Sequence, residues 1–203
     1  MPARKPGRRR FPVLTTERLV LREVTLKDVP WYFNHFNTWE IMDGQETPGP
    51  KDIVTARKEL KLYFIDTFRK GVGVRWGITI KGSSELIGSA GFYKWRKETA
   101  QIETGYDLDP RYWGKGIMRE TMVAIINYAF NVMKVNRIEV LISPRNSNSL
   151  GLVRRLGFKK EGVLREHFLY KGRLTDDVLL SLLKKEWKPD RVSHNYKTAQ
   201  RMV

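Results

Sequence analysis

The sequence predicts one α/β domain built on a mixed β-sheet with helices packed on its faces. Short runs that alternate apolar and polar residues predict strands, and runs with apolar residues three and four positions apart predict helices. The two kinds of run follow one another in the order βααβββαβαββ, with no internal repeat and no second core. The chain has 203 residues, 41% of them hydrophobic, so one domain with a full core accounts for it.

The elements follow from these patterns in chain order. The expected strands are residues 16–24, 74–80, 85–92, 102–108, 137–142, 163–170 and 178–183. The expected helices are residues 27–36, 52–70 and 149–156, with a long helix from Met118. Thr25 should cap the first helix, because a threonine side chain accepts hydrogen bonds from the first turn. Residues 37–50, with two Gly and two Pro, are expected to form a loop. The core residues expected in the helix over 52–70 are Ile53, Leu60, Tyr63, Phe64 and Phe68.

The most informative stretch is the turn between strand 102–108 and the helix that begins at Met118. Pro110 ends the strand because proline lacks the N–H that a sheet needs. Residues 111–117 then form a basic turn with glycine at positions 114 and 116. The first N–H groups of a helix have no partner within it and carry the positive end of its dipole. Since glycine leaves these groups accessible, the turn is a candidate pyrophosphate site, and a plain strand–helix connection is the alternative.

Two familiar phosphate-binding loops do not fit this turn. A Walker loop needs glycine at Asp109 and Ser or Thr at Gly116. A dinucleotide-binding fingerprint needs a third glycine where Arg119 stands. The residues therefore indicate a phosphate-binding turn without naming its ligand.

Charge and cysteine content limit the classes of function. The net charge of +16 suits an anionic cofactor, an acidic peptide or a complex that contains RNA. Half of this charge lies near the two ends of the chain. We interpret residues 1–12 as a basic mobile arm, residues 13–187 as the domain and residues 188–203 as a basic tail. A solubilising role is the alternative for both ends. The absence of cysteine excludes disulfides, thiolate nucleophiles and cysteine-ligated zinc.

The expected location is the cytoplasm, without a membrane partner. No apolar run in the sequence approaches the roughly 18 residues of a membrane span. Arg8-Arg-Arg-Phe11 is similar to an export signal, but residues 12–17 lack the apolar segment that such a signal requires.

Four motifs together resemble the GNAT N-acetyltransferase superfamily over about residues 16–188. Arg111-Tyr-Trp-Gly-Lys-Gly116 is similar to the Arg/Gln-x-x-Gly-x-Gly/Ala loop of that family, and Asn146-Ser-Asn-Ser-Leu-Gly-Leu-Val-Arg-Arg-Leu-Gly-Phe158 is similar to its Asn-x-x-Ser/Ala helix. Thr16-Glu-Arg-Leu-Val-Leu-Arg22 and Gly162-Val-Leu-Arg165 resemble the RimJ/RimL-like branch, the ribosomal-protein alanine/serine N-acetyltransferases. The resemblance implies the GNAT fold, with a mixed, mostly antiparallel central sheet and helices on both faces.

The resemblance also implies acetyl-CoA as co-substrate. It would lie in a notch between strands 102–108 and 137–142, with backbone groups around Leu108 on the pantetheine arm and Asn146 on the other side. The N–H groups of the turn would bind the pyrophosphate. The implied cofactor-binding residues of the turn are Arg111, Tyr112, Trp113, Gly114, Lys115, Gly116 and Ile117. Trp113 is expected to pack or to lie on the adenine side.

Two residues are implied to carry the chemistry. Glu103 corresponds to a glutamate that acts as general base, often through water, and Ser149 corresponds to the serine that protonates the departing thiolate. Many GNAT enzymes instead use a tyrosine where this chain has Val153. The alternatives are a solvated carboxylate at Glu103 and a helix-start serine that satisfies a backbone N–H at Ser149.

The other candidates carry less chemistry. His35, His167 and His194 lack the spacing of metal ligands, so we expect structural or surface roles and no metal. Four aromatic residues are candidates for the wall of an amine-binding groove or for core packing, namely Trp31, Trp39, Tyr93 and Trp95.

The expected function is acetylation of an amine, foremost the N-terminal α-amine of a ribosomal or other protein. One alternative is acetylation of a small amine such as a polyamine or an antibiotic. The basic surface disfavours polycations, but an acidic groove at Glu40, Asp43 and Glu46 would reverse this. Another alternative is a basic module that binds RNA or the ribosome through the two ends of the chain. The acceptor and the oligomeric state, including a homodimer, stay open.

Overall fold

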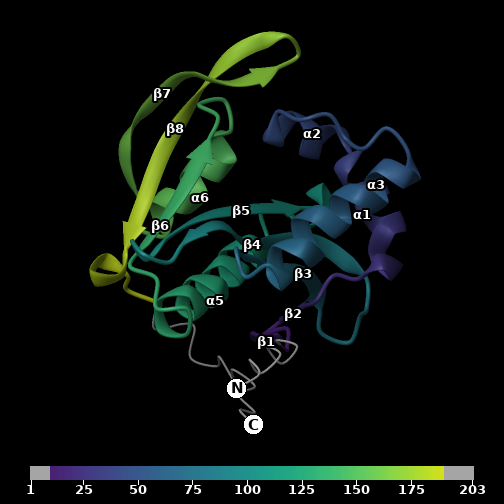
Figure 1. The fold of residues 1–203 in the computed structure, drawn as a ribbon, viewed down its shortest axis with the longest axis horizontal. Coiled ribbons are helices and arrows are strands. Elements are labelled where there is room, and N and C mark those ends of the chain that lie inside the picture. Colours follow the sequence, from purple (N-terminus) through teal and green to yellow (C-terminus); the bar gives the residue numbers. More distant parts are fainter. Residues whose placement is uncertain (1–9, 190–203) are drawn as a thin grey trace, which may run out of the picture.

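The computed structural model describes residues 10–189 of the chain. Within them, eight strands form one sheet in the order β1-β2-β3-β4-β5-β6-β8-β7 (Figure 1). Neighbouring strands are antiparallel except β5 and β6, which are parallel. The strands are β1 (Leu14–Thr15), β2 (Leu19–Arg22), β3 (Val74–Ile80), β4 (Leu86–Arg96), β5 (Gln101–Leu108), β6 (Arg137–Ile142), β7 (Lys159–Tyr170) and β8 (Arg173–Leu183). The predicted mixed, mostly antiparallel sheet is confirmed.

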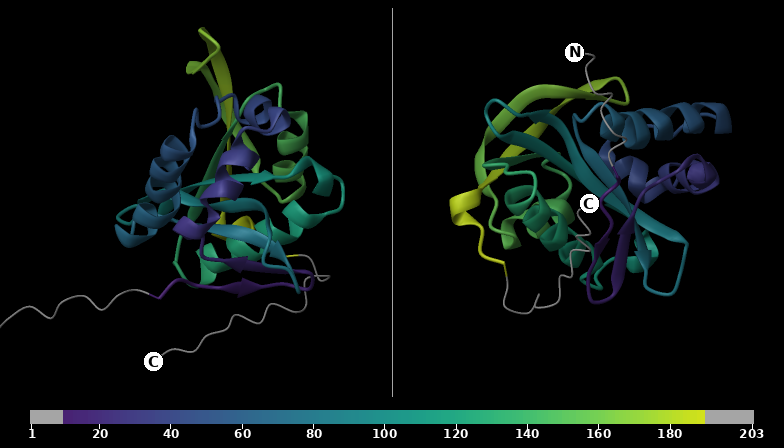
Figure 2. Two further views of the ribbon diagram at one scale, coloured as in Figure 1. Left: turned by 90° about the vertical axis from the view of Figure 1, so that its right-hand side faces the viewer. Right: turned by 60° about the horizontal axis from the view of Figure 1, so that its bottom comes forward.

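Helices cover both faces of this sheet (Figures 1 and 2). The α-helices are α1 (Val29–Phe36), α2 (Trp39–Gln45), α3 (Ile53–Leu60), α4 (Thr67–Arg69), α5 (Ile117–Asn131) and α6 (Ser147–Arg155). The larger core joins one face of the sheet to α5 and α6. A smaller core joins α1 and α3 to the other face through Val24 and Leu86. Apolar residues at helical spacing explain why α5 is buried along most of its length, as its sequence predicts.

The prediction of a loop over residues 37–50 is wrong in its middle, where α2 forms. Ile41 is the one buried residue of α2, so the helix lacks the apolar periodicity that would identify it in the sequence. A residue far away in the sequence stabilises α2 instead, since Asn146 Nδ2 donates a hydrogen bond of 2.9 Å to the Gly44 carbonyl oxygen. Contacts between segments a hundred residues apart are not visible in local sequence.

The helix predicted over residues 52–70 forms over residues 53–69, but its middle part is a π-helix (Lys61–Asp66). Its wider turns rotate the following side chains around the helix axis. Phe64 is buried as expected, whereas Tyr63 is 55% exposed. Ile53 is 48% exposed, so two of the five core residues expected in this helix lie at the surface.

Most predicted strands occur, and the errors lie at their ends. β3 and β6 match the prediction residue for residue, while β4, β7 and β8 extend several residues beyond it. The additional residues are mostly polar or exposed, so apolar alternation does not mark them. The short β1 was not predicted. Thr25 is a cap, as predicted, but of a 3-10 turn (Leu26–Asp28) that leads into α1: its Oγ1 accepts a hydrogen bond from the Lys27 N–H at 3.3 Å.

The parallel strands β5 and β6 pair at one end and then diverge. Their ladder joins Gln101 to Arg137 and ends at the pair Glu103–Glu139, although both strands continue. An opening therefore forms in the sheet beyond Glu103, at the place where the resemblance implies the cofactor notch.

The predicted arm and tail fall mostly outside the described part of the chain, which begins at residue 10 and ends at residue 189. From Phe11 onward the chain contacts the domain. The ring of Phe11 lies 4.9 Å from that of Phe68, and the Pro12 carbonyl oxygen accepts a hydrogen bond of 2.6 Å from Trp76 Nε1. Among the helices within residues 10–189, none is long and apolar enough to cross a membrane.

Candidate active site

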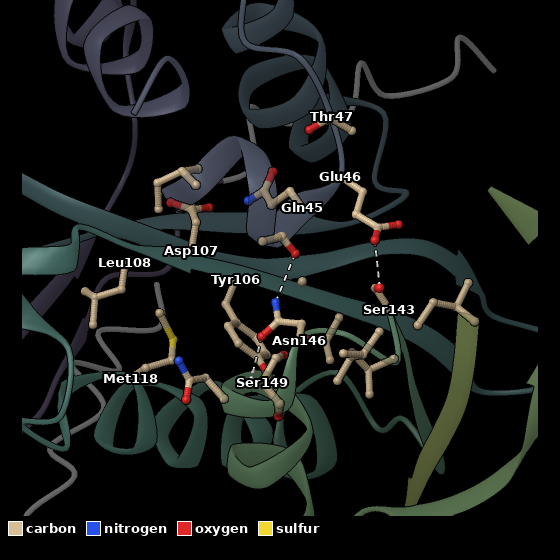
Figure 3. Close-up of a pocket in the computed structure, with 18 of the residues that line it drawn as sticks. Gln45, Glu46, Thr47, Tyr106, Asp107, Leu108, Met118, Ser143, Asn146 and Ser149 are labelled. Carbon is tan, nitrogen blue, oxygen red and sulfur yellow. Dashed lines mark hydrogen bonds between the residues drawn. The ribbon is translucent and has the colours of Figure 1, made fainter. Parts of the chain in front are cut away.

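A cleft of about 1390 Å³ opens where β5 and β6 diverge, beneath α2 (Figure 3). A cavity of this size accommodates two substrates rather than one small ligand. The cleft brings together most of the candidate site residues of the sequence, namely Glu103, Leu108, Tyr112, Trp113, Gly114, Gly116, Ile117, Asn146 and Ser149. Arg111 and Lys115 are exposed and do not line it.

The glycine turn at one end of the cleft presents unpaired N–H groups. Among the described residues, the backbone N–H groups from Gly114 to Met118 donate to no acceptor. Those of Tyr112 and Trp113 are used locally, because they donate to the carbonyl oxygens of Asp109 and Pro110. Gly114 and Gly116 have φ values of 72° and 73°, a left-handed conformation that glycine adopts without a steric cost. Five consecutive N–H groups are thus available to an anion at the start of α5.

The loop between β1 and β2 fixes the conformation of this turn. Arg18 Nη1 donates a hydrogen bond of 3.0 Å to the Lys115 carbonyl oxygen, and Arg18 Nε donates one of 2.7 Å to Glu120. Burial acts to raise the pKa of Glu120, but hydrogen bonds from Thr16 and Arg18 outweigh burial and hold it below its usual value. Arg18 thus binds the turn through its Lys115 carbonyl, while Gly114, Gly116, Ile117 and Met118 line the cleft.

The remaining side chains of the turn are directed to local partners. Arg111 Nη2 lies 2.6 Å from Asp109 Oδ2, and both Arg111 and Lys115 lie over the ring of Tyr112. Trp113 Nε1 donates a hydrogen bond of 2.6 Å to the Leu108 carbonyl oxygen. Trp113 therefore ties the end of β5 to the turn.

Glu103 lies where the β5–β6 ladder ends. It is 8% exposed, and its Oε2 accepts a hydrogen bond of 3.0 Å from Lys94 Nζ. Lys94 has a φ of 51° in the irregular segment of β4 between Tyr93 and Arg96, which places its ammonium group against Glu103. This largely buried carboxylate at the cleft has the position that a general base needs.

Ser149 contacts a tyrosine that the sequence analysis did not select. The hydroxyl oxygens of Ser149 and Tyr106 lie 2.6 Å apart across the opening between α6 and β5 (Figure 3). Burial raises the pKa of Tyr106 to about 12, so its hydroxyl keeps its proton at neutral pH. The backbone N–H of Ser149 donates to Asn146 Oδ1 at 3.0 Å, which makes Asn146 the cap of α6 and leaves the Ser149 hydroxyl for other partners.

Beside this pair, α2 and the segment after it close one side of the cleft. Buried Glu46 accepts hydrogen bonds from Ser143 Oγ at 2.8 Å and from Thr175 Oγ1 at 3.0 Å (Figure 3 shows the first). Asp43 accepts a hydrogen bond of 3.3 Å from the Tyr170 hydroxyl. Asn146 thus has two tasks, since its Nδ2 binds α2 while its Oδ1 caps α6.

A buried polar cluster forms part of the cleft wall, around Asp107 of β5. Asp107 Oδ1 lies 2.6 Å from His35 Nε2, and its Oδ2 accepts hydrogen bonds from Arg75 Nη2 at 2.5 Å and from Ser89 Oγ at 2.6 Å. Burial acts to raise the pKa of Asp107, but His35, Arg75 and Ser89 outweigh burial and hold it below its usual value. Asp107 is therefore an ionised, fully bonded anchor for Arg75.

A family model for the acetyltransferase (GNAT) domain matches residues 18–159. The chain is a GNAT acetyltransferase. The matched span includes the glycine turn, Glu103, Tyr106 and Ser149, so the cleft is built almost wholly from the family domain. Enzymes of this family use acetyl-CoA as the acetyl donor.

Named relatives cover nearly the whole of this GNAT acetyltransferase. The uncharacterised N-acetyltransferase p20 of Bacillus licheniformis is 36% identical over 86% of this chain and 97% of its own. The [ribosomal protein uS5]-alanine N-acetyltransferase of Escherichia coli K12 is 32% identical over 88% of this chain and 94% of its own. The crystal structure of spermidine N-acetyltransferase from Vibrio cholerae, in complex with CoA and spermine, has a TM-score of 0.73 at 21% identity and covers 83% of this chain and 96% of its own. This last likeness shows the shared fold.

The histidines of this GNAT acetyltransferase have unequal surroundings. His35 is buried against Asp107 and stacked on Trp31, while His167 Nδ1 lies 2.8 Å from Asp177 at the rim of the cleft. His194 lies outside the described residues. Within residues 10–189, no three His, Asp or Glu side chains converge as metal ligands do.

Two of the four aromatic residues predicted as candidates for the wall of an amine-binding groove line the cleft, and two do not. Trp39 and Tyr93 line the cleft, and Trp39 is 59% exposed. Trp31 and Trp95 do not line it and pack against the cores. The sequence patterns did not single out Tyr106, Asp107, Arg75 or Lys94, which all line the cleft. Side chains alternate between the two faces of β5, so the sequence puts Asp107 on the same face as Glu103. This alternation is the one sequence signal for Asp107.

Proposed function

We propose that this GNAT acetyltransferase moves the acetyl group of acetyl-CoA to the N-terminal α-amine of a protein. The observation that carries the proposal is the arrangement of the cleft, with unpaired N–H groups from Gly114 to Met118 at one end and buried Glu103 at the other. When these N–H groups bind the diphosphate of acetyl-CoA, the thioester end of acetyl-CoA lies in the opening between β5 and β6.

The N–H groups of the glycine turn bind the pyrophosphate in this proposal. Their number and the helix dipole of α5 favour an anion without a lysine clamp. Arg111 and Lys115 contribute positive charge from the rim, since both side chains are exposed. Trp113 keeps the end of β5 and the turn in register through its bond to Leu108.

Glu103 and the Tyr106–Ser149 pair divide the proton transfers. Glu103 accepts the proton of the α-ammonium group, directly or through one water molecule, so that the neutral amine nitrogen attacks the acetyl carbon. The C–N bond forms and the C–S bond breaks. Ser149 gives its proton to the departing sulfur and recovers one from Tyr106, whose hydroxyl is protonated at neutral pH. The attacking nitrogen releases its second proton to solvent as the C–S bond breaks, and Tyr106 takes a proton back from solvent. A base of moderate strength suffices for an α-amine, whose ordinary pKa is about 8, against about 10.4 for lysine.

The surroundings of the cleft support a peptide acceptor over a polyamine. Of the three acidic residues at which the sequence predicts a polycation site, Glu46 is buried and bonded to Ser143 and Thr175. Asp43 lies 3.7 Å from Arg145 Nη2. Glu40 alone keeps no partner of this kind among the described residues. The similarity to the uS5-alanine enzyme of Escherichia coli also supports a protein N-terminus, and a ribosomal protein is the acceptor we expect first.

Calorimetry and product analysis test this proposal together. The full chain should bind acetyl-CoA saturably, and mass spectrometry should show acetylation of a peptide with a free N-terminal alanine. The same peptide with a blocked α-amine and a free lysine should not react, and spermidine should react poorly. Faster acetylation of spermidine than of the peptide would assign the small-amine function instead. Absence of acetyl-CoA binding by the folded protein would overturn the proposal altogether.

A further inference from the structure

Gly105 lies between Glu103 and Asp107 on one face of β5 and leaves open space there because it has no side chain. Arg75 Nη1 and the Tyr93 hydroxyl lie next to this space. A Cβ atom built on Gly105 would lie 3.6 Å from Arg75 Nη1 and 3.6 Å from the Tyr93 hydroxyl oxygen. It would also lie 3.2 Å from Tyr93 Cε1. Gly105, Arg75 and Tyr93 all line the cleft. A side chain at position 105 would therefore occupy space that the cleft now offers to a ligand.

Arg75 is held in place with one amino group unused. Its Nε donates a hydrogen bond of 2.9 Å to Ser89 Oγ, and its Nη2 donates to the buried carboxylate of Asp107. Within the described residues, Nη1 makes no hydrogen bond. The guanidinium group is always protonated, so Nη1 presents hydrogen-bond donors to the space above Gly105.

The Tyr93 hydroxyl is a second available donor. Its one hydrogen bond, to the Thr104 carbonyl oxygen, is 3.5 Å long, at the outer limit for such a bond. Burial and the charge of Glu103 raise the pKa of Tyr93, so the hydroxyl keeps its proton at neutral pH. Two donors without a strong acceptor thus reach one small region of the cleft.

We propose that Arg75 Nη1 and the Tyr93 hydroxyl bind a peptide carbonyl oxygen of the acceptor above Gly105. This inference rests on the proposed function. It assigns a peptide as the acceptor because the cleft offers a binding site for a peptide carbonyl group. The oxygen of a carbonyl group accepts hydrogen bonds, whereas an ammonium group only donates them and would be repelled by the guanidinium group.

The spacing along β5 fits this assignment. Residues on one side of a strand repeat every second position, so Glu103 and Gly105 lie about 6.7 Å apart. An extended peptide that places its α-amine at Glu103 brings one of its first carbonyl oxygens to the region above Gly105. A polyamine of the same length has no oxygen to offer there. Arg75 and Tyr93 therefore favour peptides over simple amines.

Rate comparisons with two acceptors test the site. One acceptor is a peptide that begins with alanine, and the other is isopropylamine, which has the same amine-bearing carbon and no carbonyl group. For Tyr93→Phe, the ratio of kcat/KM for the peptide to kcat/KM for isopropylamine should fall about three- to tenfold, mainly through a higher KM for the peptide. Gly105→Ala should lower the same ratio further, because the methyl group occupies the proposed carbonyl site. Tyr128→Phe, a matched control at a tyrosine that does not line the cleft, should leave the ratio unchanged.

The outcomes separate this inference from the proposed function. An equal loss for both acceptors in Tyr93→Phe and Gly105→Ala, or no loss for the peptide, would overturn the carbonyl site and leave the acetyltransferase function standing. A wild-type protein that acetylates neither acceptor would overturn both. Thermal unfolding of each variant excludes a general loss of structure as the cause of a changed ratio.

Discussion

The hydroxyl oxygens of Tyr106 and Ser149 lie 2.6 Å apart, one on β5 and the other on α6, across the opening of the sheet. They are 43 residues apart in the chain, and the divergence of β5 and β6 gives Tyr106 access to α6. The pair forms a chain of two proton donors beside the cofactor notch. In the proposed mechanism, this pair supplies the proton that a tyrosine at the position of Val153 would supply.

Removal of either hydroxyl should slow the chemical step. In Ser149→Ala and Tyr106→Phe we expect single-turnover acetylation to fall at least about tenfold, because the thiolate loses its proton source. Affinity for acetyl-CoA, measured by calorimetry, should change much less. Since the pKa of Tyr106 is about 12, kcat of the wild-type enzyme should show no loss of activity from this tyrosine between pH 7 and 10. Full activity in both variants would exclude the pair from catalysis.

The glycine turn should respond to an added side chain in two ways. Gly114→Ala places a methyl group at a φ of 72°, which should lower the free energy of unfolding by about 1 kcal/mol. The methyl group also enters the open space beside the turn, where the proposal places the pyrophosphate, so the Kd for acetyl-CoA should rise at least about tenfold.

Gly82 provides a matched control for that variant. It has a φ of 84°, lies in the turn between β3 and β4, and has no atom within 4 Å of an added Cβ, as is also true of Gly114. Gly82→Ala should therefore cost similar stability and leave the Kd for acetyl-CoA unchanged. If both variants weaken acetyl-CoA binding equally, the turn is not the phosphate site.

Asp107 should make stability depend on pH. Its folded-state pKa is lowered, so its ionised form stabilises the fold above the ordinary value of about 3.9, and this contribution is lost as the pH falls through the folded value. Asp107→Asn should lower the free energy of unfolding by about 3 kcal/mol at pH 7, since it leaves Arg75 and His35 without the carboxylate. Urea unfolding should show this difference shrinking below about pH 4. A difference that is constant from pH 7 to pH 3 would contradict the ionised anchor.

The turn and the strands around it were predictable because their signals are local. Pro110 ends the strand, two glycines adopt left-handed conformations, and the apolar spacing of α5 starts directly afterwards. The resemblance to a known family supplied the rest of the fold and the identity of the cofactor, which the residues by themselves did not name.

The features that local sequence did not reveal depend on long-range contacts. α2 buries one residue of its own and is held by Asn146 and by neighbours in the β7–β8 hairpin. The cluster of Asp107 with His35 and Arg75 spans three elements far apart in the chain. Alternation along β5 gives the side on which Asp107 lies and not the partners that meet it there.

Single-turnover kinetics of Glu103→Gln test the central claim most directly. Glu139→Gln is the matched control, because Glu139 faces Glu103 in the β5–β6 ladder and does not line the cleft. With saturating acetyl-CoA and an alanine peptide, acetylation by Glu103→Gln should be about 100-fold slower or more, with little change in the Kd for acetyl-CoA, while Glu139→Gln stays near the wild-type rate. Equal rates in the two variants, or a loss in Glu103→Gln that comes entirely from weaker acetyl-CoA binding, would contradict the assignment of Glu103 as the base.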